Sequence, residues 1–173
     1  MLDRESSNSR IGLIADTHIL QDGVEPPHQV AEIFEGVNLI LHAGDLIVLS
    51  VLDWLEKIAP VLAVRGNGDS GLPADPRLVE TRTLTVCGKR IGLCHNLDTR
   101  SDLQNTMERY FGGKVDIIVF GDTHVASIET HQGILVINPG SPSIPRGLVG
   151  VPGTVGMLDI IGGAVEARII QLG

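Results

Sequence analysis

The feature that most restricts the fold of this chain is a series of five short apolar runs, each ending on polar residues. The polar ends are Asp16-Thr-His18, Asp45, Asn67, His95 and Asp122-Thr-His124. Short apolar runs of this kind are typical of buried β-strands. The carboxyl ends of parallel strands lie at one edge of a sheet, so topology alone would bring several of these polar residues together.

Helical patterns separate the first three runs. Apolar residues at helical spacing cover 30–37, behind Pro26-Pro27, and 48–58, before Pro60. Strands that alternate with helices predict parallel crossover units and an α/β class.

The second half of the chain is predicted to hold more hairpins. Residues 79–86 and 90–94 form one hairpin, a helix follows over 98–111 with a capping box from Ser101 to Gln104, and a strand covers 115–120. Three further pieces of sheet are expected at 125–130, 134–137 and in a last hairpin over 154–172. We predict a flexible N-terminal tail over 1–10 and one domain over 11–173, with two packed sheets and helices on their outer faces.

Composition excludes several classes of function. The 173 residues are 43% hydrophobic, which suits one domain with a full core, and the net charge of −8 argues against binding to nucleic acid. Aromatic residues make up 3% of the chain, too few for a base-stacking surface. We find no leader-like start and no apolar run long enough to span a bilayer. Cys87 and Cys94 do not form a zinc-type pair, and reduced thiols favour a cytoplasmic protein.

The polar strand ends have the composition of a metal site. Three carboxylates, three imidazoles and one amide, without a thiolate, suit Mn²⁺, Fe, Ni²⁺, Zn²⁺ or Mg²⁺. The set exceeds the needs of one ion and matches two ions that share a carboxylate. Alone, Asp16, Asp45 or Asn67 is well explained as a helix cap or turn former, and His18 or His124 as a hydrogen-bonded residue at the sheet edge. The ordered recurrence of these residues at strand ends favours a metal site. The predicted ligands are Asp16, His18, Asp45, Asn67, His95, Asp122 and His124.

These motifs, in this order, resemble the calcineurin-like metallophosphoesterase superfamily. The segment from Asn138 to Arg146 resembles the small YfcE-like phosphodiesterase branch of it. The resemblance implies a four-layer αββα sandwich of two mixed β-sheets. It also implies that Asp16, His18, Asp45 and His124 hold a first metal, and that Asp45 bridges to a second metal.

The second metal would be bound also by Asn67, His95 and Asp122, with Asp45 and Asn67 as the catalytic residues. The chain departs from the family at three positions. The family usually has His at the position of Asp122 and Gly at that of Asn96, and larger members have a general-acid His at the position of Gly68. The carboxylate of Asp122 favours Mn²⁺ or Mg²⁺ over Zn²⁺.

The implied function is a phosphodiesterase that acts on a small molecule. A hydroxide held between two divalent ions, with manganese favoured, would attack phosphorus in line. Arg65 and His42 are predicted to bind substrate, although His42 is as well explained by a role in orienting a ligand or by the core, and Arg65 by neutralising acidic neighbours. Two alternatives stay open: a phosphomonoesterase, or a metal-independent protein-interaction scaffold, as in a retromer subunit of the same fold. Family members often form dimers or tetramers, which leaves a homo-oligomer open.

Overall fold

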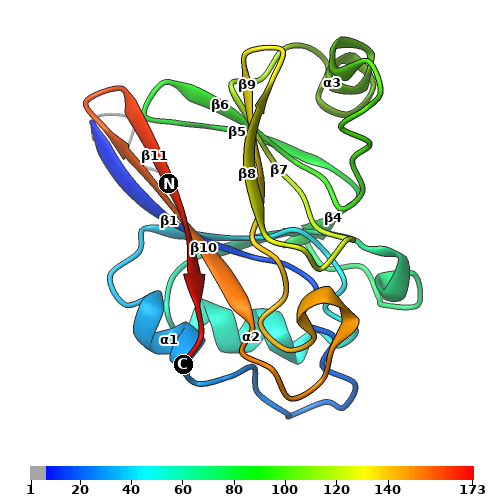
Figure 1. Ribbon diagram of the computed structural model, residues 1–173. Helices are drawn as coiled ribbons and strands as arrows, with labels where there is room; N and C mark the ends of the chain where they lie inside the picture. The colour runs from blue at the N-terminus through cyan, green and yellow to red at the C-terminus, as the bar shows by residue number, and fades with distance from the viewer. Residues whose placement is uncertain (1–6) are drawn as a thin grey trace.

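The computed structural model describes residues 7–173, which form two mixed β-sheets (Figure 1). The first sheet has the strand order β11-β10-β1-β2-β3-β4, and the second has the order β5-β6-β7-β9-β8. The strands of the first sheet are β1 (Asn8–Ile14), β2 (Leu39–His42), β3 (Val61–Val64), β4 (Leu78–Val79), β10 (Thr154–Ile161) and β11 (Ala164–Gln171). Those of the second are β5 (Arg82–Val86), β6 (Lys89–Leu93), β7 (Ile117–Val119), β8 (Ser127–His131) and β9 (Ile134–Asn138).

Both sheets have parallel strands with antiparallel additions at an edge. β1, β2, β3 and β4 run parallel, and β10 and β11 extend the sheet in antiparallel fashion. In the second sheet, β6, β7 and β9 are parallel, while β5 and β8 are antiparallel to their neighbours. The predicted mixture of crossover units and hairpins is confirmed.

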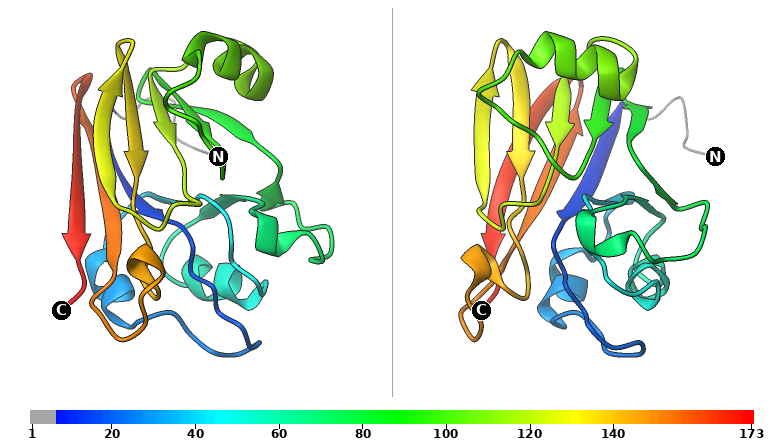
Figure 2. Two further views of the ribbon diagram at one scale, coloured as in Figure 1. Left: turned by 45° about the vertical axis from the view of Figure 1, so that its right-hand side comes forward. Right: turned by 90° about the vertical axis from the view of Figure 1, so that its right-hand side faces the viewer.

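Three helices cover the outer faces of the sheets, so the layers follow the order αββα. α1 (Gln29–Ile33) and α2 (Ser50–Glu56) pack on the first sheet, and α3 (Leu103–Phe111) packs on the second. Figure 2 shows the two sheets next to each other, with α3 on the opposite side of the molecule from α1 and α2. The predicted four-layer sandwich is confirmed.

Alternation along the strands divides the core into three layers. In β1, Leu13 faces the second sheet, whereas Ile14 faces α1 and α2. β7 repeats the pattern, since Val119 lies between the sheets and Ile118 lies under α3. Strands buried on both faces read as continuous apolar runs, which is why they are evident in the sequence.

Most helix and strand boundaries differ from the predicted ones by a few residues, and two differences change how the chain is organised. The predicted strand 79–86 is divided, because β4 pairs with β3 in the first sheet before the chain crosses to β5 in the second. α3 begins at Leu103, since the side chain of Asp102, rather than that of Ser101, accepts a hydrogen bond from the Gln104 N–H.

The tail predicted over 1–10 is too long. β1 begins at Asn8, where it pairs with Ile161 of β10, and Arg10 forms an ion pair of 2.7 Å with Asp159. These cross-strand contacts explain why a polar segment is part of the sheet. The rest of the predicted tail, residues 1–6, lies outside the described residues. Within 7–173, no helix is long and apolar enough to cross a membrane.

Candidate metal centre

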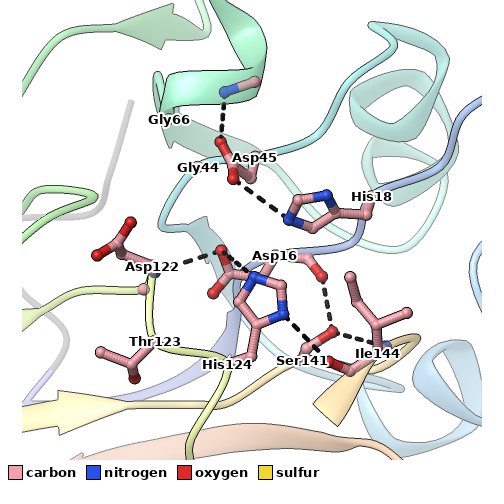
Figure 3. Close-up of polar contacts among 12 residues, drawn as sticks. Asp16, His18, Gly44, Asp45, Gly66, Asp122, Thr123, His124, Ser141 and Ile144 are labelled. Atoms are coloured by element: carbon pink, nitrogen blue, oxygen red, sulfur yellow. Dashed lines mark hydrogen bonds and ion pairs between the residues drawn. The ribbon is translucent and has the colours of Figure 1, made fainter. Parts of the chain in front are cut away.

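Four of the predicted ligands form a tight cluster at the carboxyl ends of the parallel strands. One ligand atom from each of these four residues lies within 4.8 Å of the others; they are Asp16, His18, Asp45 and His124. His18 Nε2 is 3.2 Å from Asp45 Oδ2, and His124 Nε2 is 3.6 Å from Asp16 Oδ1. In Figure 3 these side chains point toward one another.

Both sheets contribute to the cluster. Asp16 follows β1 and Asp45 follows β2, which are parallel neighbours, and His124 follows β7 of the other sheet. Backbone hydrogen bonds connect the two loops of the first sheet, from the Asp16 N–H to the Gly44 carbonyl and from the His18 N–H to the Asp45 carbonyl. The loop geometry is therefore fixed by main-chain contacts as well as by side chains.

The backbone of these residues adopts an uncommon conformation. Five predicted ligands have positive φ angles between 45° and 70°: Asp16, His18, Asp45, Asp122 and His124. Non-glycine residues in this region cost about 1–3 kcal/mol each and persist where the surroundings enforce them, as they do at functional sites. The geometry turns each side chain out of its strand and into the shared centre.

The other three predicted ligands surround the opposite side of Asp45. His95 Nε2 lies 3.5 Å from Asp45 Oδ1 and 3.6 Å from Asp122 Oδ1. The Asn67 amide donates to Asp122 Oδ1 at 3.5 Å. The structure thus brings all seven predicted ligands together, and the two carboxylate oxygens of Asp45 face separate groups of them.

The donor atoms of this centre fit metal ions. Within the described residues, three of the buried side-chain atoms that have no hydrogen-bond partner belong to predicted ligands: Asp16 Oδ2, His18 Nε2 and His95 Nε2. Buried polar atoms are normally paired, so these atoms indicate a missing partner. His95 Nδ1–H donates to the Ala43 carbonyl at 2.7 Å, and His124 Nδ1–H donates to the Ile144 carbonyl at 3.1 Å. Such contacts fix a histidine tautomer and leave Nε2 as the ligand atom.

The centre also perturbs the acidity of its members. Burial raises the pKa of Asp16 to about 6, although the nearby His95 and His124 oppose this shift. Burial also acts to raise the pKa of Asp45, but the contacts with His18 and with the Gly68 N–H outweigh it and lower that pKa to about 2. The Asp45 contact raises the pKa of His18 in turn. A divalent cation would stabilise the ionised form of Asp16 in place of a proton.

Two glycines next to the ligands are required by close backbone approach. Gly44 has a φ of +96°, and a Cβ there would lie 2.6 Å from His95 Nδ1. A Cβ on Gly66 would collide with Asp45 Oδ1. The glycines beside the predicted ligands therefore allow the strand ends to meet.

The structure does not support substrate binding by His42. Its side chain is fully buried, its Nδ1 accepts a hydrogen bond from the Gly44 N–H, and its Nε2–H donates to Thr17 Oγ1 with an N···O distance of 3.1 Å. Burial, with a further contribution from the neighbouring His95, lowers the pKa of His42 to about 3, which agrees with the neutral ring that an accepting Nδ1 requires. Its contacts with Thr17 and Gly44 are compatible with both alternatives, a residue that orients a ligand and a histidine of the core.

Arg65 is also engaged within the protein. Its guanidinium donates to the carbonyls of Asp69, Leu72 and Pro73, at distances between 2.8 and 3.2 Å. These hydrogen bonds hold the loop after β3 in place and direct the guanidinium to that loop rather than to the predicted ligands.

The role of Asp69 is not evident from the sequence, where an aspartate two residues after Asn67 is typical of a turn. Its fully buried carboxylate accepts hydrogen bonds from the N–H groups of Asp45, Ile47 and Gly66. It thereby joins the loop after β2 to the loop after β3. Its proximity to Asn67 was the only signal in the sequence, and a turn explains that spacing equally well.

Ser141 was missed as well. It is fully buried, its hydroxyl donates to the Asp16 carbonyl at 2.7 Å, and it accepts from the Ile144 N–H at 2.9 Å. The same segment provides the carbonyl that orients His124. The resemblance of residues 138–146 to the YfcE-like branch indicated that this segment is important, but it did not show which of its residues contact the predicted ligands.

Comparison with known proteins agrees with this geometry. Residues 10–162 match the family model described as the calcineurin-like phosphoesterase superfamily domain. The chain is 38% identical over 167 residues to a "Probable metallophosphoesterase" of Methanothermobacter thermautotrophicus, covering 94% of this chain and 92% of that protein. It is 48% identical over 121 residues to "Phosphodiesterase YfcE" of Escherichia coli (strain K12), covering 63% and 58% of the two chains.

Among solved structures, Vacuolar Protein Sorting 29 from Cryptosporidium parvum is similar in fold. The TM-score is 0.74 at 21% identity, with 96% of this chain and 98% of that chain covered. The family match spans every predicted ligand, and the homologues share most of the chain. The protein therefore belongs to the calcineurin-like phosphoesterase superfamily.

Proposed function

We propose that this protein is a phosphodiesterase that uses two divalent cations to hydrolyse a small-molecule phosphodiester by in-line displacement at phosphorus. The observation that carries the proposal is the position of Asp45. One of its carboxylate oxygens faces His18 and the other faces His95, at 3.2 and 3.5 Å. A carboxylate placed in this way suits two cations that share it.

The ligands divide into two groups around this shared carboxylate. Asp16, His18 and His124 would complete the first position, and Asn67, His95 and Asp122 would complete the second. The site contains three carboxylates, whose mutual repulsion two divalent cations would offset. The oxygen ligands of the second position favour Mn²⁺ or Mg²⁺ over Zn²⁺.

When bound, the two cations would supply an activated water and positive charge for the phosphate oxygens. The chain's own residues hold this arrangement: Asp45 is fixed by the Gly68 N–H at 2.8 Å, and Asp16 Oδ1 accepts from the Asp122 N–H at 3.3 Å. Asn67 is exposed at the opening of the site, where its amide can contact a phosphate oxygen.

The absence of a side chain at Gly68 favours diesters over monoesters. Gly68 lies 2.8 Å, through its N–H, from Asp45 Oδ1 and has no side chain that could donate a proton to the leaving group. General acid catalysis is typically worth about 10²- to 10⁴-fold in rate. Without it, we expect esters with good leaving groups to react fastest, and aryl phosphodiesters to be better substrates than alkyl monoesters.

The test compares wild type with Asp45→Ala on bis(4-nitrophenyl) phosphate after chelator treatment and addition of Mn²⁺. We expect wild type to lose activity with the chelator and to regain it with Mn²⁺. Asp45→Ala should lose more than the roughly 100-fold that removal of an outer partner costs. Glu108→Ala, on the exposed side of α3, is the control. Equal rates for Asp45→Ala and wild type would refute the proposal.

A protein-interaction scaffold is the second candidate function. It is favoured by three exposed apolar side chains on one loop, Leu148, Val149 and Val151, of which Val149 is 85% exposed. A scaffold would purify without stoichiometric metal and would keep its thermal stability in chelator. A phosphodiesterase would contain metal and melt at a lower temperature once the metal is removed.

A further inference from the structure

The two carboxylate oxygens of Asp122 have different surroundings. Its Oδ2 accepts a hydrogen bond of 2.8 Å from the Asn96 side-chain amide. Its Oδ1 faces His95 Nε2 at 3.6 Å and the Asn67 amide at 3.5 Å. One oxygen is therefore held by the protein, and the other faces the centre.

The position of Asn96 suits it to hold this carboxylate. It directly follows His95, whose ring is already fixed by the Ala43 carbonyl, and the Gly121 N–H donates to the His95 carbonyl at 2.9 Å. The segments after β6 and β7 are thus joined by one main-chain bond and one side-chain bond. The Asp122 side chain is 30% exposed, so without Asn96 its carboxylate would be free to rotate toward solvent.

A separate observation shows that this side of the centre faces a ligand. His95 Nε2 belongs to a side chain that is only 4% exposed, yet it has no hydrogen-bond partner. One carboxylate oxygen of Asp45 lies 3.5 Å from this nitrogen, and one of Asp122 lies 3.6 Å from it. A buried imidazole nitrogen between two carboxylates indicates a cation at this position.

We propose that Asn96 is the positioning residue for the second cation. By holding Oδ2 of Asp122, it keeps Oδ1 directed at His95 and makes Asp122 a ligand through one oxygen. The inference rests on the proposed two-cation function and adds a residue that does not itself touch the cation. Because the Asn96 amide contacts the Asp122 carboxylate directly, we expect the two residues to act as a unit.

The test is a calorimetric titration of Mn²⁺ into the chelator-treated, full-length protein. We expect two binding steps in wild type. Asn96→Ala should leave the first step unchanged and weaken the second by about 10- to 100-fold, as for other outer partners of metal ligands. The matched control is Asn105→Ala, an exposed asparagine on α3, which should bind Mn²⁺ as wild type does. Circular dichroism would establish that each variant is folded.

A double-mutant comparison identifies the route of the effect. If Asn96 acts through Asp122, then adding Asn96→Ala to Asp122→Ala should weaken the second step no further. The inference is overturned if Asn96→Ala retains the wild-type second step, if it weakens both steps equally, or if the losses in the double variant are additive. Wild type that binds a single Mn²⁺ would overturn the two-cation function as well, so the two failures can be told apart.

Discussion

The buried carboxylate of Asp69 offers the sharpest test of how the site is supported. It accepts hydrogen bonds from the N–H groups of Asp45, Ile47 and Gly66, at 2.8 to 2.9 Å. The variant Asp69→Ala removes the acceptor for all three. Each unsatisfied buried group costs about 1–3 kcal/mol, so three would cost about 3–9 kcal/mol.

We expect the lower part of this range, about 3–5 kcal/mol, because Ile47 and Gly66 are half-buried and water can replace part of the loss. Against a total stability of about 5–15 kcal/mol for a typical domain, this is a large fraction. The loss should also release the left-handed backbone of Asp45, whose φ is 58°, and so weaken Mn²⁺ binding.

Urea unfolding of the metal-free proteins, followed by circular dichroism, measures the first effect, and calorimetry with Mn²⁺ measures the second. The control is Asp102→Ala, which removes an exposed helix cap that accepts one N–H bond and should cost about 1 kcal/mol. If Asp69→Ala loses no more stability than Asp102→Ala, the reasoning about the buried network is wrong.

Three further predictions concern residues around the centre. The pKa of His42 is lowered from 6.5 to about 3 in the folded protein, so the unfolded state takes up the proton first as the pH falls. The free energy of unfolding should therefore decrease below about pH 6.5, by up to about 1.4 kcal/mol per pH unit. In urea titrations at pH 7, 6 and 5, His42→Leu should lose this part of the pH dependence. Arg65→Ala should lower the urea midpoint, since three loop carbonyls lose their donor. The KM for an aryl phosphodiester should stay within about twofold of wild type, and a large rise in KM would instead support Arg65 as a substrate-binding residue. Gly44→Ala introduces a Cβ 2.6 Å from His95 Nδ1 at a φ of +96°, so it should lower the free energy of unfolding by at least about 1–3 kcal/mol and weaken metal binding. The control Gly88→Ala, at a turn with open space around it, should lower stability without changing metal affinity.

The layers and the predicted ligands were accessible from the sequence because both follow from local patterns. A strand buried on both faces is a continuous apolar run, and Asp16, Asp45 and His124 follow such runs within a few residues. Parallel pairing then brings their ends to one edge. The structure confirms the four-layer fold and brings the seven predicted ligands together.

The supporting contacts could not be predicted because they depend on distance in space. Nothing local distinguishes Asp69, which joins two loops, from an aspartate such as Asp22, which lies in the turn closed by the bond from the Val24 N–H to the Gln21 carbonyl. Arg65 carries the charge that a phosphate would need, but the 69–73 loop folds back over its guanidinium. His42 was ambiguous for the same reason, since only the fold shows that both ring nitrogens are used inside the protein.

The origin of the ligands in both sheets has a mechanical consequence. Asp16 and Asp45 follow strands of one sheet, while His95 and His124 follow strands of the other. A cation bound among them would act as a cross-link over the interface between the sheets. Any opening that separates the two halves of the sandwich must first release it, so amide protons of both sheets should exchange more slowly in the metal-loaded protein. At a free metal concentration 100 times Kd, each site would add about 2.7 kcal/mol to the free energy of such global opening.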